Sequence, residues 1–501
     1  MESGSVYPKS QVKGIYKIND VKVMIGFGKA QLLIFTVGSF YIIYCICEIM
    51  GMAIISPSSN CDLNIQNAEQ AELMTSTFKG LILSSYYIGF LSDKYGRRTI
   101  LIYSTLLTFT FSLLSTLMPN YYSYHFMRVL TGIFLAGPII VTLPYVAEFM
   151  LDQYRTKVMN YLYMFNGVGM IYMPGTAQIL INMNWKINLI IITYRPWRLL
   201  GFIYILPGII ALVLLYHLPE SPKYLLAADK HDEAFKVVNW ISLRNNGVPL
   251  ESLGVVGFEP LLSRDNNVNR IWICELWLDL LPIFAKAYVK QFLLSCATML
   301  GLVAVASGLG LWYTDVRNRL RISNEISEDN EITLCERISE FESANITLRF
   351  DSRPQPCFEY IKQFWDSITM GICFIAGYNI IGLLLLITNR KRIFIYSLII
   401  SGICGLCINF VTLQVLELIF LILFLVLPAI LVNFLNTFVM DNTPTYLRNK
   451  ALSIVTILGR VGAILGCHIG IYFLNNVCFL VFTLLPLISF SCAVFAYYLK
   501  I

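Results

Sequence analysis

The sequence predicts an all-α membrane protein whose twelve spanning helices form two bundles of six. Three observations carry this prediction: the composition, the spacing of long apolar segments, and a repeat in the loops between them. Hydrophobic residues fill 57% of the 501 positions and charged residues only 14%, whereas about 25% of residues are charged in an average soluble domain. A soluble fold of this length could not bury so much apolar surface, so we expect lipid to surround it.

Long apolar segments predict where the helices lie, because a helix needs roughly 20 apolar residues to cross a bilayer. Backbone groups in lipid must bond within their own segment, so each crossing should be helical. The expected spans are residues 30–55, 73–91, 99–118, 122–147, 157–182, 197–218, 290–313, 367–388, 393–412, 414–440, 451–472 and 476–499. They divide the chain into an N-terminal tail (1–29), a first bundle (30–218), a linker (219–289) and a second bundle (290–499). Within the linker we expect an amphipathic helix over 221–244 and an irregular stretch over 245–270.

The second span is the weak point of this assignment. Only 13 residues separate Lys79 from Asp93, which is about 20 Å of helix. Either the span begins near Leu73 and takes Lys79 into the membrane, or part of the usual helix is missing.

Basic residues predict the orientation. Five lysines precede the first span, and Lys and Arg follow the even-numbered spans, whereas the loops near 56–72, 119–121 and 473–476 have neither. By the positive-inside rule both termini are then cytoplasmic, in a plasma or vesicle membrane. The first apolar segment is too long for a cleavable signal peptide. The net charge of +6 is thus an orientation signal, and we expect no nucleic-acid partner.

The long loop 314–366, between the seventh and eighth spans, has features of an extracellular or lumenal segment. Asn345-Ile346-Thr347 is an N-glycosylation acceptor. Cys335 and Cys357 lie in the same loop, and disulfides persist on that side of a membrane. We therefore expect glycosylation at Asn345 and a Cys335–Cys357 disulfide; the alternative is a chance acceptor sequence and two unpaired thiols.

The loops also show an internal duplication. Gly96-Arg97-Arg98 recurs as Asn389-Arg390-Lys391, and Glu148 with Arg155 recurs as Asp441 with Arg448, in both cases 293 residues later. A shared offset indicates two bundles of like topology, a common plan in transporters. Charges at these helix ends could pair across the seam between the halves when the cytoplasmic side is closed, each pair contributing about 0.2–1 kcal/mol. The expected cytoplasmic gate comprises Gly89, Asp93, Gly96, Arg97, Arg98, Glu148, Arg155, Arg390, Asp441 and Arg448.

Several motifs resemble one known family. Gly89-Phe90-Leu91-Ser92-Asp93-Lys94-Tyr95-Gly96-Arg97-Arg98 resembles the major facilitator superfamily motif G-x-L-x-D-x-x-G-R-R, and Arg128-x-x-x-Gly132 resembles its next motif. Pro219-Glu220-Ser221-Pro222, Lys230-His231-Asp232-Glu233-Ala234 and the segment 307–315 are similar to the synaptic vesicle glycoprotein 2-like and organic-ion branch. The resemblance implies the major facilitator fold and solute transport. Residues 297–310 lack the Gln-rich motif of sugar carriers, which argues against a sugar substrate, and Thr156 replaces a glycine usual in the family.

Ionisable residues inside spans are costly and point to function. Glu48 in the first span and Arg128 in the fourth have similar depths, so they could pair in a central cavity. In proton-coupled members of the family such a pair is the protonation switch. The alternative, equally weighted, is a structural pair that never titrates.

Arg460 lies near the middle of the eleventh span. An unpaired guanidinium there would attract anions, and its planar fork suits carboxylates, so an organic anion is the favoured solute; the alternative is a carboxylate partner elsewhere in the chain. Other residues expected to line the substrate cavity are Asn166, Asn379, Tyr41, Tyr44, Asn433, Asn436 and His468. Each of these is also a plausible helix-contact residue.

The sequence contains no pattern that indicates catalysis. The four histidines are scattered without metal-ligand spacing, and there is no Walker-type loop, so we expect neither a cofactor nor ATP-driven transport. The favoured function is a monomeric secondary transporter, active or facilitative, of a small organic solute, with coupling to protons. The alternative is a non-transporting membrane glycoprotein that binds partners through 314–366; a channel is disfavoured.

Overall fold

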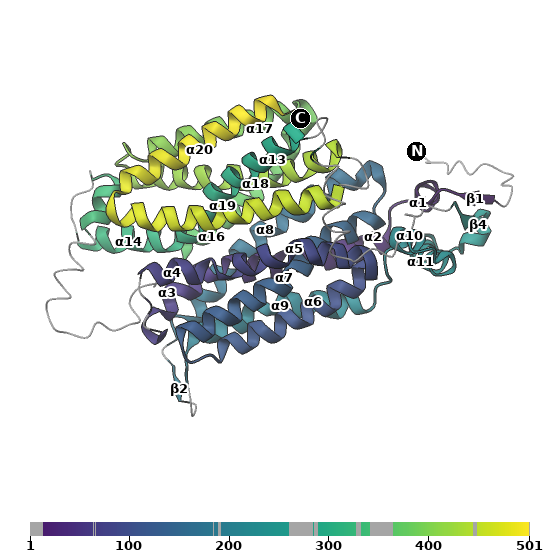
Figure 1. Cartoon of the computed structure of the whole chain (residues 1–501), viewed down its shortest axis with the longest axis horizontal. Coiled ribbons are helices and arrows are strands. Elements are labelled where there is room, and N and C mark those ends of the chain that lie inside the picture. The colour runs from purple at the N-terminus through teal and green to yellow at the C-terminus, as the bar shows by residue number, and fades with distance from the viewer. Residues whose placement is uncertain are drawn as a thin grey trace, which may run out of the picture.

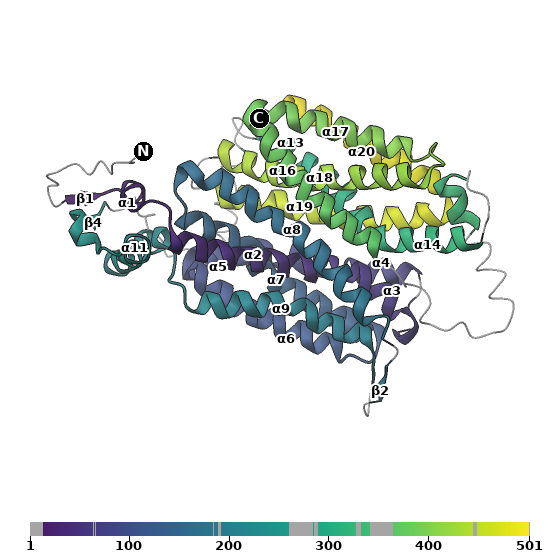
Figure 2. The same cartoon turned by 180° about the vertical axis from the view of Figure 1, so that it is seen from behind.

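The computed structural model describes a bundle of long helices that run side by side along one axis (Figures 1 and 2). The described residues are 14–63, 65, 67–183, 185–188, 192–259, 284, 289–326, 332–340, 364–443 and 448–499. The helices that correspond to the expected spans are α2 (Lys29–Met50), α5 (Ser76–Tyr95), α6 (Arg97–Thr116), α7 (Tyr121–Phe149), α8 (Asp152–Leu180), α9 (Pro196–Tyr216), α13 (Val289–Val303), α16 (Trp365–Ile387), α17 (Arg390–Cys407), α18 (Gln414–Asn442), α19 (Arg448–Asn476) and α20 (Cys478–Tyr498). The predicted all-α fold with two six-helix bundles is confirmed.

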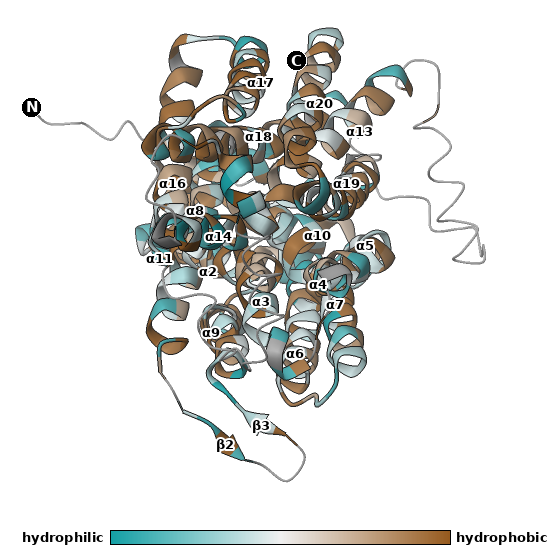
Figure 3. Ribbon diagram, turned by 90° about the vertical axis from the view of Figure 1, so that its left-hand side faces the viewer, coloured by the Kyte–Doolittle hydropathy of each residue, from teal (hydrophilic) through white to brown (hydrophobic). Residues whose placement is uncertain are grey.

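The two bundles meet along two contacts, α5 with α19 and α8 with α16. Within the described residues, nine helical stretches are long and apolar enough to cross a membrane. The helices below that threshold are α5, α8 and α17. Because α5 and α8 form the seam, part of each surface faces the other half and not lipid, so these two helices tolerate polar side chains. Apolar residues make up much of the helices of both bundles, with polar segments among them, in the view along the helices (Figure 3).

The helix boundaries repeat with the offset seen in the loops. Helices α6 and α17 begin at Arg97 and Arg390, and α7 and α18 begin at Tyr121 and Gln414, each pair 293 residues apart. The ends of α7 and α18 are separated by the same interval. The duplication thus extends from the charged loops to whole helices.

Helix α5 resolves the doubt about the second span. It begins at Ser76 and has 20 residues, which is about 30 Å and enough to cross the hydrocarbon core. A separate helix, α4 (Asn67–Met74), precedes it. Lys79 lies in the first turns of α5 and forms an ion pair with Glu72 of α4. The helix is therefore complete, and Lys79 lies near its outer end.

Glycines allow α5 and α7 to approach each other at backbone distance. A Cβ atom added to Gly132 would lie 2.2 Å from the Thr77 carbonyl oxygen, and one added to Gly80 would lie 2.1 Å from the Val129 carbonyl oxygen. Real Cβ atoms do not come so close to a backbone oxygen, so any larger residue forces the helices apart. Close packing of α5 against α7 therefore explains why the Arg-x-x-x-Gly motif has glycine at position 132.

We expect Gly132→Ala to lower the free energy of unfolding by about 1–3 kcal/mol, the usual cost of overpacking. Thermal unfolding of the purified protein in detergent measures the change. Gly175→Ala on α8 is the control, because a Cβ there meets no atom within 4 Å. Equal melting temperatures of the two variants would contradict the prediction.

The end of the bundle at which α2 begins, predicted to be cytoplasmic, carries a small additional layer. Helices α1 (Ile18–Ile25), α10 (Pro222–Ala227) and α11 (His231–Asn246) lie there, with a short 3₁₀ turn η1 (Leu250–Leu253). The expected single helix over 221–244 is divided in two where Asp229 adopts φ 59°. The linker expected to be irregular forms β4 (Val255–Phe258), which pairs in parallel with β1 (Gly14–Tyr16) of the N-terminal tail.

The outer loop after the seventh span is attached to the second bundle. Helix α13 continues through a π turn, η3 (Ala304–Leu309), and a 3₁₀ turn, η4 (Gly310–Trp312), into α14 (Tyr313–Ile326). A further helical stretch covers 334–340. Glu417 in the first turn of α18 is fully buried and forms ion pairs with Arg317 and Arg337, which fix this stretch on the bundle.

The expected Cys335–Cys357 disulfide is wrong. Cys335 bonds to Cys478, the first residue of α20, with 5.5 Å between the Cα atoms. Cys478 lies near the start of the expected span 476–499, so the sequence suggested a free thiol within a span, whereas docking of 334–340 brings Cys335 next to it. Cys357 and the glycosylation acceptor Asn345 lie outside the described residues.

Candidate functional site

The ion pair between Glu48 and Arg128 is almost completely buried inside the first bundle. The Arg128 Nη1 atom lies 2.9 Å from Glu48 Oε2, and both side chains are almost fully buried. Ser112 of α6 donates a hydrogen bond of 2.9 Å to the other Glu48 oxygen. Arg128 Nε donates to the Tyr124 hydroxyl at 3.3 Å. The pair therefore lies inside the first bundle, between α2, α6 and α7, and not in a cavity between the halves as expected.

Arg460 lies on the seam itself. Its guanidinium is 7% exposed and donates from α19 across the seam to the Ser85 hydroxyl of α5. No carboxylate of the described residues lies within 4 Å of it, so its polar partner in this part of the chain is the Ser85 hydroxyl. The alternative of a carboxylate partner thus finds no support in the described part of the chain.

A second polar cluster joins α8 to α16 and α18 across the seam. The Tyr378 hydroxyl accepts a hydrogen bond of 2.5 Å from Asn433 and is hydrogen-bonded to Asn166 of α8. Tyr163 of α8 lies within reach of Asn436 on α18, yet the Asn436 Oδ1 atom is buried without a hydrogen-bond partner among the described residues. Sequence reasoning found the three asparagines and missed the two tyrosines, which only helix packing brings to them.

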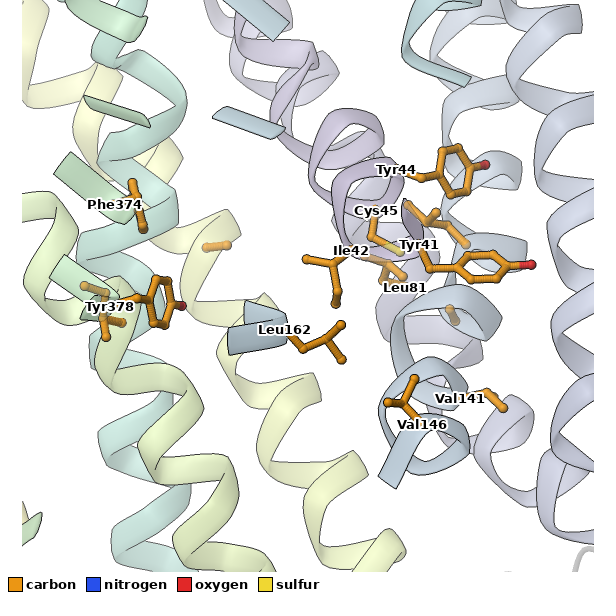
Figure 4. Close-up of a cluster of buried hydrophobic side chains, with 14 of the residues drawn as sticks. Tyr41, Ile42, Tyr44, Cys45, Leu81, Val141, Val146, Leu162, Phe374 and Tyr378 are labelled. Atoms are coloured by element: carbon orange, nitrogen blue, oxygen red, sulfur yellow. The ribbon is translucent and has the colours of Figure 1, made fainter. Parts of the chain in front are cut away.

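Three other predicted cavity residues lie elsewhere. Tyr41 and Tyr44 extend from α2 away from the seam, on the opposite side from Tyr378 (Figure 4). Thr105 of α6 donates to the Tyr41 hydroxyl at 3.4 Å, and the Tyr44 ring packs edge-on against Phe109 at 5.3 Å. Both therefore belong to the interior of the first bundle. Asn379 is exposed at the edge of the seam: it donates to the Ile375 carbonyl of its own helix at 2.8 Å and to Met164 Sδ of α8 at 3.4 Å.

Neither of the two clearest clefts formed by the described residues lies between the two polar clusters on the seam. The larger cleft, about 470 Å³, lies between α13 and α20. A smaller one, about 170 Å³, lies between α2 and α8. The halves are thus in contact at the level of Arg460 and Tyr378.

The predicted cytoplasmic gate centres on Arg97. Its guanidinium lies 2.8 Å from Asp93 and 3.2 Å from Glu148. Ser221 donates a hydrogen bond to the same Glu148 carboxylate. Glu220, missed by sequence reasoning, accepts from the Arg98 backbone N–H at 2.9 Å and so caps the start of α6. These contacts join elements of the first half and the linker, whereas we had expected Arg97 to pair across the seam.

The other gate residues have separate places. Gly96 has φ 104°, and a Cβ there would lie 2.5 Å from a Glu220 oxygen, so glycine is required. A Cβ on Gly89 would lie 3.4 Å from Ser453 Oγ of α19, so α5 approaches the second half at Gly89 as well as at Ser85. Arg155 lies in α8 and Arg390 begins α17. The side chains of Asp441 and Arg448 lie outside the described residues.

The outer end of the seam has polar contacts that sequence reasoning missed. His468 of α19 lies 3.5 Å from Glu72 of α4, and Gln178 of α8 accepts from the Phe364 N–H at 2.8 Å. Nothing in the sequence placed Glu72 at this contact, because the residues of α4 were expected to form a loop. The two halves are therefore in contact at the outer end as well as at mid-depth.

Lys22 of α1 attaches the N-terminal tail to the first bundle. Its ammonium donates to the Glu148 carbonyl oxygen and is 3% exposed. Burial, followed by the charge of Lys223, lowers the pKa of Lys22 from 10.5 to about 7, although Glu148 and Asp152 act in the other direction.

Docking of α1 should strengthen as pH rises from about 7 to 10.5. A lowered pKa means that the undocked helix binds more protons than the docked one in this window, so each pH unit shifts the docking equilibrium by up to tenfold. Below pH 7 both forms are protonated and the dependence ends. Hydrogen exchange of the backbone amides of residues 18–25 measures docking at each pH. In Lys22→Met the pH dependence of docking should vanish, so this variant is the reference. The control variant Lys17→Met should keep the pH dependence.

Comparisons with known proteins agree with the fold and the motifs. A family described as sugar (and other) transporter matches residues 32–258. Synaptic vesicle glycoprotein 2B of Mus musculus is 27% identical over 45% of this chain and 34% of its own length, and synaptic vesicle glycoprotein 2C of Homo sapiens is 24% identical over 66% and 48%. The xylose transporter XylE from E. coli, in a partially occluded inward open conformation, superposes with a TM-score of 0.63 at 15% identity, over 94% of this chain and 97% of that one.

These likenesses support a transporter of the major facilitator superfamily, and the relatives among them support its synaptic vesicle glycoprotein 2-like branch, which the loop motifs also indicate. The chain spans about a third to a half of the length of these relatives. Together with the nine apolar helices among the described residues, these likenesses support a multi-pass membrane protein.

Proposed function

We propose that this major facilitator protein is a secondary transporter that moves a small organic anion by alternating access. The proposal is supported by the duplicated halves and by a seam whose contacts are individually weak. The observation that carries it is Arg460, a buried guanidinium that bridges the seam to Ser85. No described carboxylate neutralises it.

Burial of an uncompensated cation in a membrane protein is costly, and such residues mark substrate or ion pathways. An anionic solute would supply the missing negative charge, and a carboxylate or sulfonate would match the planar fork of the guanidinium. The buried Asn436 Oδ1 atom, which has no partner in the described residues, would accept a hydrogen bond from a donor on the same solute. The two groups come from different helices of the second half, α19 and α18, and both face the first half.

Uptake into proteoliposomes tests the proposal. The purified protein is screened with labelled organic anions, organic cations and sugars, each with and without a pH gradient. We expect uptake of one or more anions, and at least a tenfold loss in Arg460→Ala with partial retention in Arg460→Lys. Arg244→Ala, which removes a guanidinium that packs on Trp240 in the cytoplasmic layer, is the matched control.

Two outcomes would remove parts of the proposal. Uptake of cations alone, with Arg460→Ala unaffected, would exclude the anion. Absence of uptake for every solute by folded protein would favour the alternative, a non-transporting glycoprotein.

Proton coupling is the second part of the proposal and rests on the Glu48–Arg128 pair. Protonation of Glu48 would release Arg128 from its carboxylate partner and change the packing of α2 against α7. Glu48→Gln imitates the protonated state, so uptake driven by a pH gradient should lose its dependence on the gradient while exchange of solute across the membrane continues. Unchanged gradient-driven uptake in Glu48→Gln would exclude the coupling and leave a structural pair.

A further inference from the structure

The outer loop between α8 and α9 forms a small hairpin with two chemically different faces. Strands β2 (Ile187–Asn188) and β3 (Thr193–Tyr194) pair antiparallel, with Ile187 opposite Tyr194 and Asn188 opposite Thr193. Side chains alternate between the faces of a strand. Ile187 and Tyr194 therefore share one face, and Asn188 and Thr193 share the other.

Neighbouring residues extend the same alternation. The Trp185 ring stacks on the Tyr194 ring, with centroids 6.3 Å apart and planes 19° apart, which places Trp185 on the apolar face. Lys186 is exposed between Trp185 and Ile187, so it joins the polar face. The sequence that follows β2, Leu189-Ile190-Ile191-Ile192, has no polar side chain. The hairpin is thus amphipathic along its described length.

The apolar face has no protein cover at its centre. The Ile187 side chain is 55% exposed. A two-stranded hairpin is marginally stable in water by itself, and packing of one apolar face against another surface stabilises it. Contact of this face with a surface outside the described chain would therefore stabilise the hairpin.

The base of the hairpin is held firmly against the bundle. Arg195 lies 2.9 Å from Asp62 of α3 (Met52–Leu63), and Trp197 Nε1 donates to the same carboxylate at 2.8 Å. Arg198 donates to the Thr116 carbonyl oxygen at the end of α6 at 2.7 Å. These contacts determine where the hairpin leaves the bundle.

The direction of the hairpin identifies its partner. It leaves the outer ends of the helices across their long axis (Figures 1 and 2), and it extends away from the edge of the bundle when the protein is viewed along the helices (Figure 3). Because the helices cross the bilayer, this direction runs along the membrane surface. Trp and Tyr gather at that level in membrane proteins.

We propose that the hairpin lies in the interface of the outer leaflet as a lipid-binding element. Trp185, Ile187 and Tyr194 enter the boundary between headgroups and acyl chains, and Lys186 on the opposite face reaches lipid phosphates. An element with one apolar and one polar face takes this position because each face meets its own solvent. The occupant of the apolar face is therefore phospholipid, not a second protein.

A pair of adjacent cysteine variants tests the proposal in the full chain. Ile187→Cys reports on the apolar face and Asn188→Cys on the polar face of the same strand. Each variant is labelled with an environment-sensitive fluorophore and placed in phosphatidylcholine nanodiscs that hold one copy of the protein. The protein without the new cysteine is labelled in parallel, and its fluorescence is subtracted to remove the contribution of the native cysteines. We expect a shift to shorter wavelength and several-fold stronger quenching by spin-labelled lipid at 187 than at 188.

Three results would overturn the proposal: water-like emission at both positions, equal quenching at both, or a shift at 187 that requires several copies in one disc. The last result would assign the face to a protein contact. If Ile187→Cys fails to give folded protein, Tyr194→Cys and Thr193→Cys provide the same comparison on β3.

Discussion

Replacing Arg128 by methionine should lower the free energy of unfolding by about 3–5 kcal/mol, because it leaves the Glu48 carboxylate buried without its partner. The carboxylate would keep the hydrogen bond from Ser112, which does not neutralise it. Methionine retains the length of the aliphatic part of the side chain, so lost packing contributes little. Thermal unfolding in detergent and the yield of monodisperse protein measure the effect.

The double variant Glu48→Gln with Arg128→Met is the control for this prediction. It removes both charges, and replacement of a buried pair by neutral groups is often close to neutral in stability. We therefore expect the second substitution to restore most of the stability. A double variant as unstable as Arg128→Met alone would show that the loss arises from packing and not from the unpaired charge.

Cys335→Ser should have the second large effect, a loss of about 2–5 kcal/mol. The bond joins residues 143 positions apart, and closure of a longer loop removes more conformational entropy from the unfolded chain. It also attaches the outer loop to α20. We expect a lower melting temperature in Cys335→Ser, reproduced in the unmodified protein by reductant.

Cys407→Ser is the matched control, because Cys407 is free and partly buried. Peptide mapping without reduction provides a direct check. A peptide that links Cys335 to Cys478 is expected, and one that links Cys335 to Cys357 would contradict the structure.

Much of the fold was predictable from local sequence features. A bilayer permits only segments that satisfy their own backbone, so apolar length alone located the helices. The common offset of 293 residues indicated the duplication, and it could be read from the sequence because each loop motif consists of residues close together in the chain. The weak second span was misjudged because Lys79 was treated as a barrier, whereas its partner Glu72 lies on α4, a helix that hydropathy does not reveal.

The candidate site was predictable only in part. Residue type and depth identified Glu48, Arg128 and Arg460, since a charge at mid-membrane is conspicuous in any sequence. They did not show that Tyr41 and Tyr44 point into the first bundle, because the direction of a side chain depends on how its helix is rotated. Nor did they show Tyr163 and Tyr378, since tyrosine is common in spanning helices.

The twelve spans, their duplication and the family motifs are properties of the sequence, because each depends on contiguous residues and on the solvent around them. Contacts between distant segments depended on the tertiary structure: Arg97 with Glu148 in place of a partner across the seam, Cys335 with Cys478 in place of Cys357, and Arg460 with Ser85. The physical reason is that helix rotation and crossing are determined by close packing, at positions such as Gly132 where a methyl group would not fit, and such packing is a property of pairs of helices and not of either helix alone.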